Sequence, residues 1–377
     1  MIKALDMERH AYAVIIAGGK GTRFWPLSRP QHPKQLLKIL SGKSLIRETV
    51  DRTVPLFGSR NTLVVTVAEH YRALRREIPV LSERNFVVEP QGNNTAPCIG
   101  LAALEVAARD PDAVMAILPA DHWVPDPGSF SHALRGALRL ARSAGSLVTI
   151  GIRPSYPETG YGYILKGKRF KGPGGVPCYR VKGFKEKPTR QRAALLVRRG
   201  SLWNSGMFAW RVSTILQMLR GFSPAIARSL ERIQVAMRDK GLANPSAGLR
   251  AVVRREYRRM PKVSIDYAVL EKAGAAGRLL ALEGRFGWSD VGSWAAAHRM
   301  LPHDGKGNVG LGKWLGFQSK DCFVYSRDRL VALLGVHGLV VVDTPDALLV
   351  AAMERSQEVR ELVEELKRRG YGRYAIR

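Results

Sequence analysis

The sequence predicts a doubly wound α/β domain that is followed by a small β-rich region and a terminal helix. Short β-branched runs alternate with helical patterns from residue 11 to about residue 152, which is the alternation of a mostly parallel sheet. Ligands of such sheets bind beyond the carboxyl ends of the strands, so the segments 18–23 and 119–122 are the first places to look for a site. The candidate strands, which are apolar on both faces as buried parallel strands are, lie at 13–17, 63–67, 86–89, 113–118 and 147–151.

The elements that follow change in character along the chain. Before the fifth strand, apolar residues recur at helical spacing from residue 130 to residue 141, and Ser129 is the predicted N-cap of that helix. Gly-rich and aromatic segments from 156 to 210 predict a second sheet region that carries loops, and 211–259 reads as helical. We expect two domains, at 1–295 and 296–377. Within the second, short strands are predicted at 321–325, 331–334 and 339–342, before a closing helix at 357–369.

The composition is that of a globular protein in a reducing compartment. Hydrophobic residues make up 45% and charged residues 24% of the 377 positions, so the chain can bury a core. The three cysteines, Cys98, Cys178 and Cys322, form no closely spaced pair, which disfavours a disulfide framework or a thiolate zinc site. The first ten residues lack a secretory apolar stretch, and the apolar run at 330–342 is shorter than the roughly 20 residues of a membrane span. We expect a cytoplasmic protein that binds no membrane.

The chain is strongly basic. It has 60 Lys and Arg against 32 Asp and Glu, which gives a net charge of +28. This charge predicts anionic partners. Charge alone does not distinguish phosphorylated metabolites from nucleic acid as the partner. Residues 181–260 alone carry 18 Lys and Arg against 4 Asp and Glu. The basic residues of 211–259 are not interleaved with stacking aromatics and match no nucleic-acid motif, so we expect no specific nucleic-acid partner.

A glycine-rich turn follows the first strand. Gly18, Gly19 and Gly21 let the backbone approach an anion closely, while Lys20 and Arg23 supply positive charge. The spacing matches neither the dinucleotide-binding fingerprint nor a Walker A loop, so a simple tight turn is the alternative.

The loop after this turn strengthens the phosphate interpretation. Three prolines keep 24–36 from forming a regular helix throughout, and the loop ends by presenting Lys34. A long rigid loop that carries Arg23 and Lys34 suits a polyphosphate.

Two isolated carboxylates lie in loops. Asp121 ends the fourth strand at the ligand edge of the sheet and is well placed to hold Mg²⁺, which prefers carboxylate, phosphate and water oxygens. Asp290, in the Gly- and Trp-rich segment 287–294, could share that ion. The alternative for Asp121 is a helix cap or an Asx-turn, and His122 without partners is more often a hydrogen-bonded side chain than a ligand.

A third group of polar residues follows the Gly-rich region. Glu186 and Lys187 are adjacent, so in an extended strand only one of them can face a given cleft unless a bend near Pro188 intervenes. An exposed, ion-rich strand end is the alternative. Asn204 carries amide groups suited to sugar hydroxyls, although Asn before a Ser-Gly turn also occurs for backbone reasons alone.

Nine segments, taken in order, carry a resemblance to a known family. The chain resembles the mannose-1-phosphate guanylyltransferases (GDP-mannose pyrophosphorylases) of the nucleotide-sugar pyrophosphorylase superfamily over nearly its whole length. The resemblance implies a Rossmann-like nucleotidyltransferase (GT-A-like) domain and a left-handed β-helix-like C-terminal region. The segments are AGGKGTRFWPLSRPQHPKQ (17–35), EPQGNNTAP (89–97), LPADH (118–122), TGYGYI (159–164), FKEKP (184–188), WNSGMF (203–208), SIDYAVLEK (264–272), GWSDVGSW (287–294) and VVDTPDALLV (341–350).

The family's activity implies GTP and mannose 1-phosphate as partners, Mg²⁺ as cofactor, and GDP-mannose and pyrophosphate as products. An oxygen of the sugar phosphate would attack the α-phosphorus in line, so catalysis would be mainly positioning and charge neutralisation. Another hexose 1-phosphate or nucleotide is the alternative, and a catalytically silent basic protein is a more remote one.

The resemblance also assigns roles to matching positions. Arg23 and Lys34 would hold the triphosphate and the leaving pyrophosphate, while Asp121 and Asp290 would bind Mg²⁺. The nucleotide would be contacted by Gly18, Gly19, Gly21, Thr22, Gln91, Asn94 and Thr95, and the sugar phosphate by Gly162, Glu186, Lys187 and Asn204.

Two positions depart from the family pattern. Lys20 stands where Ser is common, and Gly338 stands where an acidic residue is common. The chain ends at Arg377 without the cupin-like isomerase domain of longer relatives, so we expect a single activity. A homodimer is possible, and the sequence does not decide the oligomeric state.

Overall fold

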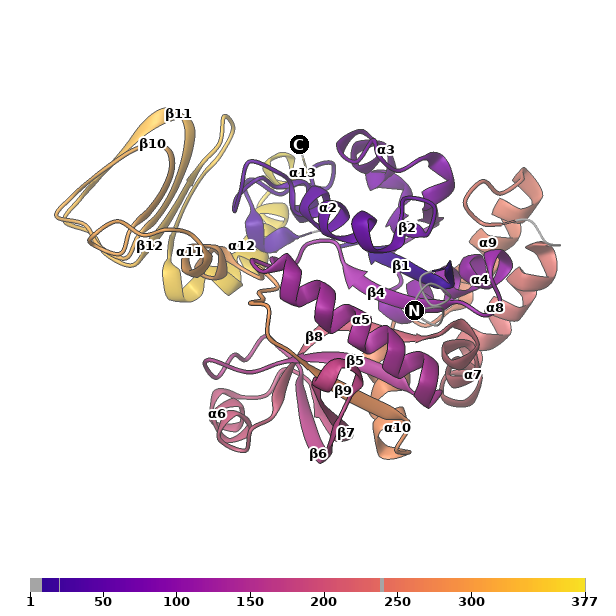
Figure 1. The fold of residues 1–377 in the computed structure, drawn as a ribbon. Coiled ribbons are helices and arrows are strands. Elements are labelled where there is room, and N and C mark those ends of the chain that lie inside the picture. Colours follow the sequence, from indigo (N-terminus) through magenta and orange to yellow (C-terminus); the bar gives the residue numbers. More distant parts are fainter. Residues whose placement is uncertain (1–8, 20, 238–240, 377) are drawn as a thin grey trace.

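A nine-stranded sheet forms the centre of the molecule (Figure 1). The structure is a computed structural model, and it describes residues 9–19, 21–237 and 241–376. Across the sheet the strands follow in the order β3 (Phe86–Glu89), β2 (Thr62–Val67), β1 (Ala11–Ile16), β4 (Val114–Pro119), β8 (Leu202–Arg211), β5 (Leu147–Ile152), β9 (Leu279–Gly284), β7 (Pro177–Lys185) and β6 (Tyr163–Lys171).

The first four of these strands are parallel, as the sequence predicts. All five predicted strands form, and their ends differ from the predicted ends by at most two residues. In the β1–β4 pair, Ile16 lies opposite Pro119, so the two strands end side by side. This register brings the glycine-rich turn and the loop of Asp121 to the same edge of the sheet.

The region between β5 and α7 (Val212–Phe222) differs from the prediction. The expected second sheet region is wrong, because β6, β7 and β8 all belong to the main sheet. Strand β8 lies between β4 and β5 and is antiparallel to both. Its hydrogen-bonding partners are far away in the sequence, and no local pattern reveals them.

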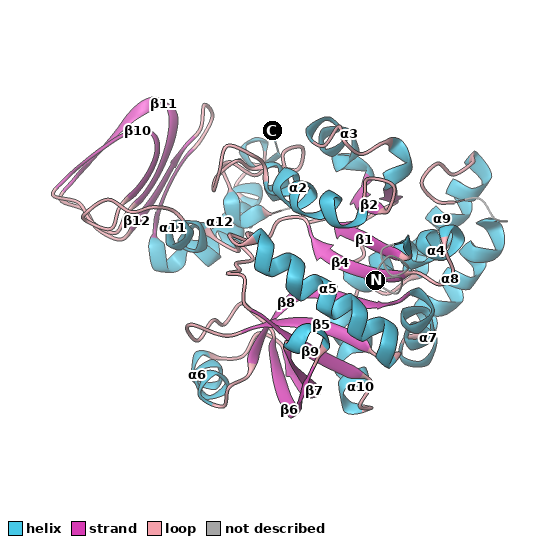
Figure 2. Ribbon diagram, viewed as in Figure 1, coloured by secondary structure: helices cyan, strands magenta, loops and turns pink. Residues whose placement is uncertain are grey.

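Helices cover both faces of the main sheet (Figure 2). The side chains of β1 alternate, so Val14 joins the core of one face while Ile15 joins the core of the other. One face packs against α4 (Thr95–Arg109), α7, α8 (Pro224–Met237), α9 (Ala247–Arg259), a π-helical turn (Asp266–Leu270) and α10 (Glu271–Ala275). The other packs against α2 (Leu45–Phe57), α3 (Ala68–Glu77), α5 (Pro127–Ala144) and α6 (Arg190–Arg198).

The start of α5 corrects one prediction. The N-cap is Asp126, not Ser129, because the Asp126 side chain accepts a hydrogen bond from the Ser129 amide at 2.9 Å. Pro127 occupies the first turn, where its missing N–H costs nothing. The helix therefore begins three residues earlier than its apolar pattern indicates.

The C-terminal region is a four-stranded sheet with helices at its ends. It consists of β10 (Val309–Phe317), β11 (Phe323–Leu334), β12 (Leu339–Asp343) and β13 (Leu348–Ala352). The first three are parallel and β13 is antiparallel to β12. The strands predicted at 321–325 and 331–334 are one continuous strand, β11, so that prediction of two strands is wrong. Flanking helices are α11 (Trp294–Met300), α12 (Val359–Arg368) and α13 (Arg373–Ile376).

This region packs onto the loop that follows β1. Phe24 and Trp25 of that loop share a hydrophobic core with Trp294 and Phe323. The rings of Phe24 and Trp294 meet edge to face with centroids 4.8 Å apart. The C-terminal region thus fixes the loop that carries Arg23 and Lys34. The division at residue 295 stays a prediction.

Among the helices that the structure describes, none is both long enough and apolar enough to span a bilayer.

Candidate active site

The two carboxylates singled out in the sequence come from loops that pair with each other. Trp123 and Ser289 exchange two backbone hydrogen bonds, of 2.9 and 3.2 Å, and form an isolated antiparallel bridge. Asp121 and Asp290 lie next to this bridge, at the carboxyl end of β4 and in the loop after β9. The neighbouring Val291 has a positive φ of 46°, which is strained for a β-branched residue. Such strain is typical of functional loops.

Lys34 connects these two loops. Its amine lies 2.8 Å from Oδ2 of Asp121 and donates a 2.5 Å hydrogen bond to the backbone oxygen of Asp290. Lys34 is buried in a short 3₁₀ turn (Lys34–Leu36) after Pro33. Burial acts to raise the pKa of Asp121, but the charge and hydrogen bond of Lys34, together with smaller contributions from neighbouring groups, outweigh burial and lower that pKa below its ordinary value. Asp121 is therefore ionised at neutral pH.

Gly21 makes room for Lys34. It has a φ of 64°, and a Cβ at this position would overlap the Cβ of Lys34. Only glycine adopts this conformation without strain and leaves the space. The Ser28 hydroxyl donates to the Gly21 carbonyl at 2.7 Å and holds the turn. The glycine is thus needed for the close approach of Lys34 to the turn, and its contact with a phosphate stays a prediction.

Two cavities meet at the carboxylates. One, of about 320 Å³, lies between β4, β8 and α4; the other, of about 540 Å³, lies over the glycine-rich turn. Both are lined by Asp121, His122 and Asp290. The first is also lined by Gly19, Gln35, Thr95, Tyr161, Gly162, Glu186, Asn204 and Asp266, and the second by Gly21, Thr22, Arg23, Lys34, Gly292, Arg360, Glu364 and Lys367.

The smaller cavity gathers polar groups around Gly162. A Cβ on Gly162 would lie 2.5 Å from Oε2 of Glu186, so the glycine leaves the space in which that carboxylate lies. The Asn204 side chain accepts from Thr149 at 3.1 Å and donates to Asp266 at 2.8 Å. These contacts fix the amide orientation and leave its other N–H for a ligand. The arrangement suits the hydroxyl groups of a sugar.

Asp266 and Tyr161 are site residues that the sequence analysis missed. Burial, followed by the nearby Glu186 charge, raises the pKa of Asp266 to about 6. The Tyr161 hydroxyl donates to Oδ1 of Asp290 at 2.7 Å. Both residues lie within segments that resemble the family, SIDYAVLEK and TGYGYI, but only their long-range contacts reveal what they touch.

His122 is buried and uncharged. Burial lowers its pKa to about 4, and its Nδ1 accepts a 3.1 Å hydrogen bond from the Trp288 indole. The interpretation of His122 as a hydrogen-bonded side chain agrees with this geometry.

Several predicted site residues lie elsewhere. Lys187 is exposed, with a φ of 41°, and its amine turns back to Oε1 of Glu186 at 2.8 Å. Strand β7 ends at Lys185, so a bend does occur here, but only Glu186 lines the cavity. Gln91 donates to Asn93 at 2.9 Å, and the Asn94 side chain caps α4; neither is among the described residues that line the two cavities.

The remaining residues of the glycine-rich turn are placed as follows. A Cβ on Gly18 would lie 3.3 Å from Oε1 of the buried Glu89, so Gly18 packs over the end of β3. Lys20, one of the two departures, lies outside the described residues. Gly338, the other, has a φ of 64° between β11 and β12 and lines neither cavity.

The two carboxylates fit a magnesium ion that also takes substrate oxygens. Each has one oxygen held by a protein donor, Lys34 or Tyr161, and one oxygen left to coordinate. A Cβ on Gly292 would lie 2.7 Å from Oδ2 of Asp290, so the glycine keeps that oxygen accessible. In the described part of the chain, no three His, Cys, Asp or Glu residues gather to hold a metal by themselves. This is the pattern of Mg²⁺, which is bound by one or two carboxylates plus phosphates and waters.

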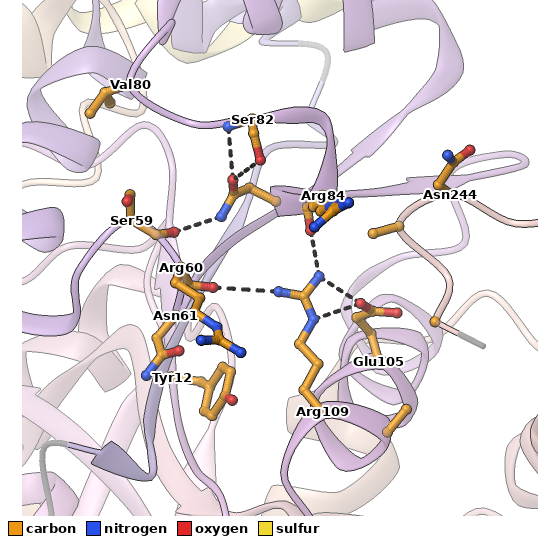
Figure 3. A pocket seen from close by; sticks show the side chains of 14 residues that line it. Tyr12, Ser59, Arg60, Asn61, Val80, Ser82, Arg84, Glu105, Arg109 and Asn244 are labelled. Atoms are coloured by element: carbon orange, nitrogen blue, oxygen red, sulfur yellow. Dashed lines mark hydrogen bonds and ion pairs between the residues drawn. The ribbon is translucent and has the colours of Figure 1, made fainter. Parts of the chain in front are cut away.

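A further cavity, of about 990 Å³, lies at the opposite end of the strands (Figure 3). Tyr12, near the start of β1, lines it. Arg109 spans it, pairing with Glu105 and donating to the backbone oxygens of Arg60 and Arg84. Because these polar groups hydrogen-bond to one another and lie at the amino end of β1, we do not place the active site there.

The sheet, the glycine-rich turn and the paired carboxylates at its carboxyl edge define a nucleotidyltransferase. Comparison with known proteins agrees: residues 12–306 match the family model for nucleotidyl transferases, and residues 312–366 match that for the MannoseP isomerase/GMP-like beta-helix domain. The chain belongs to the nucleotidyl transferase family and, within it, to the mannose-1-phosphate guanylyltransferases.

Individual relatives support this membership. The chain is 40% identical to a mannose-1-phosphate guanylyltransferase of Escherichia coli over 94% of its own length and 73% of the relative's. A Klebsiella pneumoniae mannose-1-phosphate guanylyltransferase is 39% identical over 96% of this chain and 75% of its own length. A crystal structure described as mannose-1-phosphate geranyltransferase from Thermus thermophilus is 36% identical and matches with a TM-score of 0.83, over 95% of this chain and 99% of that one.

Proposed function

We propose that the chain transfers the guanylyl group of GTP to mannose 1-phosphate, which gives GDP-mannose and pyrophosphate. The relatives' names support the reaction, and one observation carries the site: two cavities meet at Asp121, His122 and Asp290. A nucleoside triphosphate tail in one cavity and a sugar phosphate in the other would bring their reacting phosphates to this junction.

The reaction is a single displacement. An oxygen of the sugar phosphate forms a bond to the α-phosphorus of GTP, and the bond from that phosphorus to the oxygen bridging to the β-phosphate breaks. The electron pair leaves with pyrophosphate. Because the attacking phosphate is already ionised, no side chain has to remove a proton. The uncharged His122 at the junction is consistent with a site that positions phosphates and transfers no proton.

The larger cavity supplies the positive charge. Arg23 and Lys34 line it, and Lys34 lies where the α-phosphate would pass between Asp121 and Asp290. The backbone of Gly21 and the hydroxyl of Thr22 offer hydrogen bonds to phosphate oxygens. Asp121 and Asp290 would hold Mg²⁺, which would supply further positive charge to the phosphates and to the leaving pyrophosphate.

The smaller cavity would hold the sugar ring and the base at its two ends. Glu186, Asn204 and Asp266 are placed to accept and donate hydrogen bonds to sugar hydroxyls. Gly19 and Thr95 line the other part of the cavity, where the amino end of α4 would favour an anionic or electron-rich ligand edge. We assign this part to the nucleoside.

The activity is tested by pyrophosphate release from GTP and mannose 1-phosphate with Mg²⁺. The folded protein should release pyrophosphate and GDP-mannose in equal amounts, and absence of both would overturn the proposal. Asp121→Asn and Asp290→Asn should each cost about 3 kcal/mol or more of transition-state stabilisation and raise the Mg²⁺ concentration for half-maximal rate. Asp126→Asn is the control, since Asn also caps a helix well.

Substrate choice needs a separate assay, since hydroxyl geometry alone would distinguish one hexose 1-phosphate from another. We expect mannose 1-phosphate and GTP to have the highest kcat/KM in a panel of hexose 1-phosphates and nucleoside triphosphates. A higher kcat/KM for another pair would change the assigned substrates but not the type of reaction.

We also expect the protein to act in the cytoplasm, as a monomer or a homodimer.

A further inference from the structure

The C-terminal helix α12 reaches the cavity over the glycine-rich turn. Arg360, Glu364 and Lys367 of this helix line the same cavity as Arg23 and Lys34. The three are spaced by four and three residues, so they lie on one face of the helix. Two segments that are more than 300 residues apart in the sequence thus share one site.

Packing fixes the helix in this position. Val359 and Val363, on another side of α12, are buried in the core that contains Phe24, the residue after Arg23. The Trp25 indole donates a 2.8 Å hydrogen bond to the backbone oxygen of Tyr374, just beyond the helix. The helix and the glycine-rich turn are therefore held together as a unit.

The charges on this face are two cations and one carboxylate, so the face is net positive. The Lys34 amine is already bound by Asp121 and by the Asp290 carbonyl, so it serves the junction of the two cavities. Lys367 is held by Glu364 at 2.8 Å, and Arg360 is exposed to solvent. The wall of the cavity along α12 therefore carries two further cations, Arg360 and Lys367, with the carboxylate of Glu364 between them.

We infer that Arg360 and Lys367 bind the β- and γ-phosphates of the nucleoside triphosphate, and then the pyrophosphate that leaves. The inference rests on the proposed function. A guanidinium binds two phosphate oxygens at once, and an ammonium contributes a point charge. The C-terminal region is then part of the triphosphate site as well as a support for the loop that carries Arg23.

The test compares variants that remove one charge each from the same helix. Arg360→Gln and Lys367→Gln should each raise the KM for GTP roughly tenfold, as expected for loss of a charge-assisted contact to phosphate. The inhibition constant of pyrophosphate should rise by a similar factor, while the KM for mannose 1-phosphate should not change. Arg368→Gln is the matched control, because Arg368 pairs with Glu365 and does not line the cavity.

The outcomes separate this inference from the proposed function, because the wild-type protein must first show the activity. If wild type is active and the Arg360→Gln, Lys367→Gln double variant keeps its KM for GTP and its pyrophosphate inhibition, the inference is wrong. It is also wrong if Arg368→Gln has an equal effect, since a general loss of surface charge would then explain the result. A rise in both substrate KM values together with a lower Tm would show a merely structural role and would likewise overturn it.

Discussion

The Lys34 amine lies 2.8 Å from the Asp121 carboxylate and 2.5 Å from the backbone oxygen of Asp290. One side chain from the loop after β1 therefore joins the loops after β4 and β9. Removing it would break the link from the loop after β1 to the other two loops and would leave the partly buried negative charge of Asp121 uncompensated. Lys34 is therefore both a structural link and a charge partner within the site.

Lys34→Met should reduce kcat about 10²- to 10³-fold, since a preorganised donor to the reacting phosphate is lost. Because burial raises the pKa of Asp121 and Lys34 lowers it, the variant should raise that pKa. Ionised Asp121 is the active form, so the acid limb of kcat/KM against pH should move to higher pH. Lys38→Met, an exposed change in the same loop, should leave rate and profile unchanged. Equal profiles for Lys34→Met and wild type would contradict this role.

Gly21→Ala and Gly19→Ala test the turn. Gly21 has a positive φ and its added Cβ would overlap Lys34, so Gly21→Ala should lower the free energy of unfolding by about 1–3 kcal/mol and abolish most activity. No atom lies within 4 Å of a Cβ added at Gly19, so Gly19→Ala should retain full stability. Urea unfolding of both variants measures the difference. Equal losses would show that the conformation at Gly21 does not matter.

The variant Gly162→Ala tests the part of the smaller cavity that we assign to the sugar. The added Cβ would lie 2.5 Å from Oε2 of Glu186 and would displace that carboxylate. The KM for mannose 1-phosphate should rise about tenfold or more, while the KM for GTP should stay the same. Gly183→Ala on β7 is the control, since its Cβ would meet only Leu165, at an ordinary distance of 3.4 Å. A change confined to the KM for GTP would mean that the sugar and nucleoside parts of the smaller cavity have been assigned the wrong way round.

Glu89 predicts a pH dependence of stability. Burial raises its pKa from 4.5 to about 7, so the folded chain holds a proton that the unfolded chain releases between these values. The contribution of Glu89 to the free energy of unfolding is fully present below pH 4.5 and is lost as the pH rises through 7. Wild type should lose about 3 kcal/mol relative to Glu89→Gln between about pH 4.5 and pH 8.

Urea unfolding at a series of pH values measures this difference. Glu69→Gln changes the same kind of side chain at the exposed start of α3 and should keep the wild-type dependence. A constant difference between wild type and Glu89→Gln at all pH values would contradict the prediction.

Local patterns were enough to predict the first five strands and the glycine-rich turn. The ends of β1 and β4 are marked by Gly18 and Asp121, and the β-branched runs before them are buried on both faces. The start of α5 was misplaced because Pro127 and Asp126 cap the helix before its apolar pattern begins. The spacing of apolar residues within a helix does not indicate an N-cap residue that precedes the first of them.

Long-range contacts could not be predicted from the sequence. Asp266 joins the site by its hydrogen bond to Asn204, and Tyr161 by its bond to Asp290, both across many intervening residues. Strand β8 reaches its place in the sheet by pairing with β4 and β5, which no pattern within β8 indicates. Arg360 and Lys367 reach the glycine-rich turn only because the whole C-terminal region folds back onto it.

The configuration at the α-phosphorus tests the central claim most directly, since the two cavities would place the attacking and leaving groups on opposite sides of it. The measurement uses GTP with a thiophosphate of known configuration at the α-position, together with mannose 1-phosphate. Direct attack predicts inversion of configuration in the GDP-mannose analogue that forms. Retention would require two displacements and a covalent intermediate, and would contradict the account.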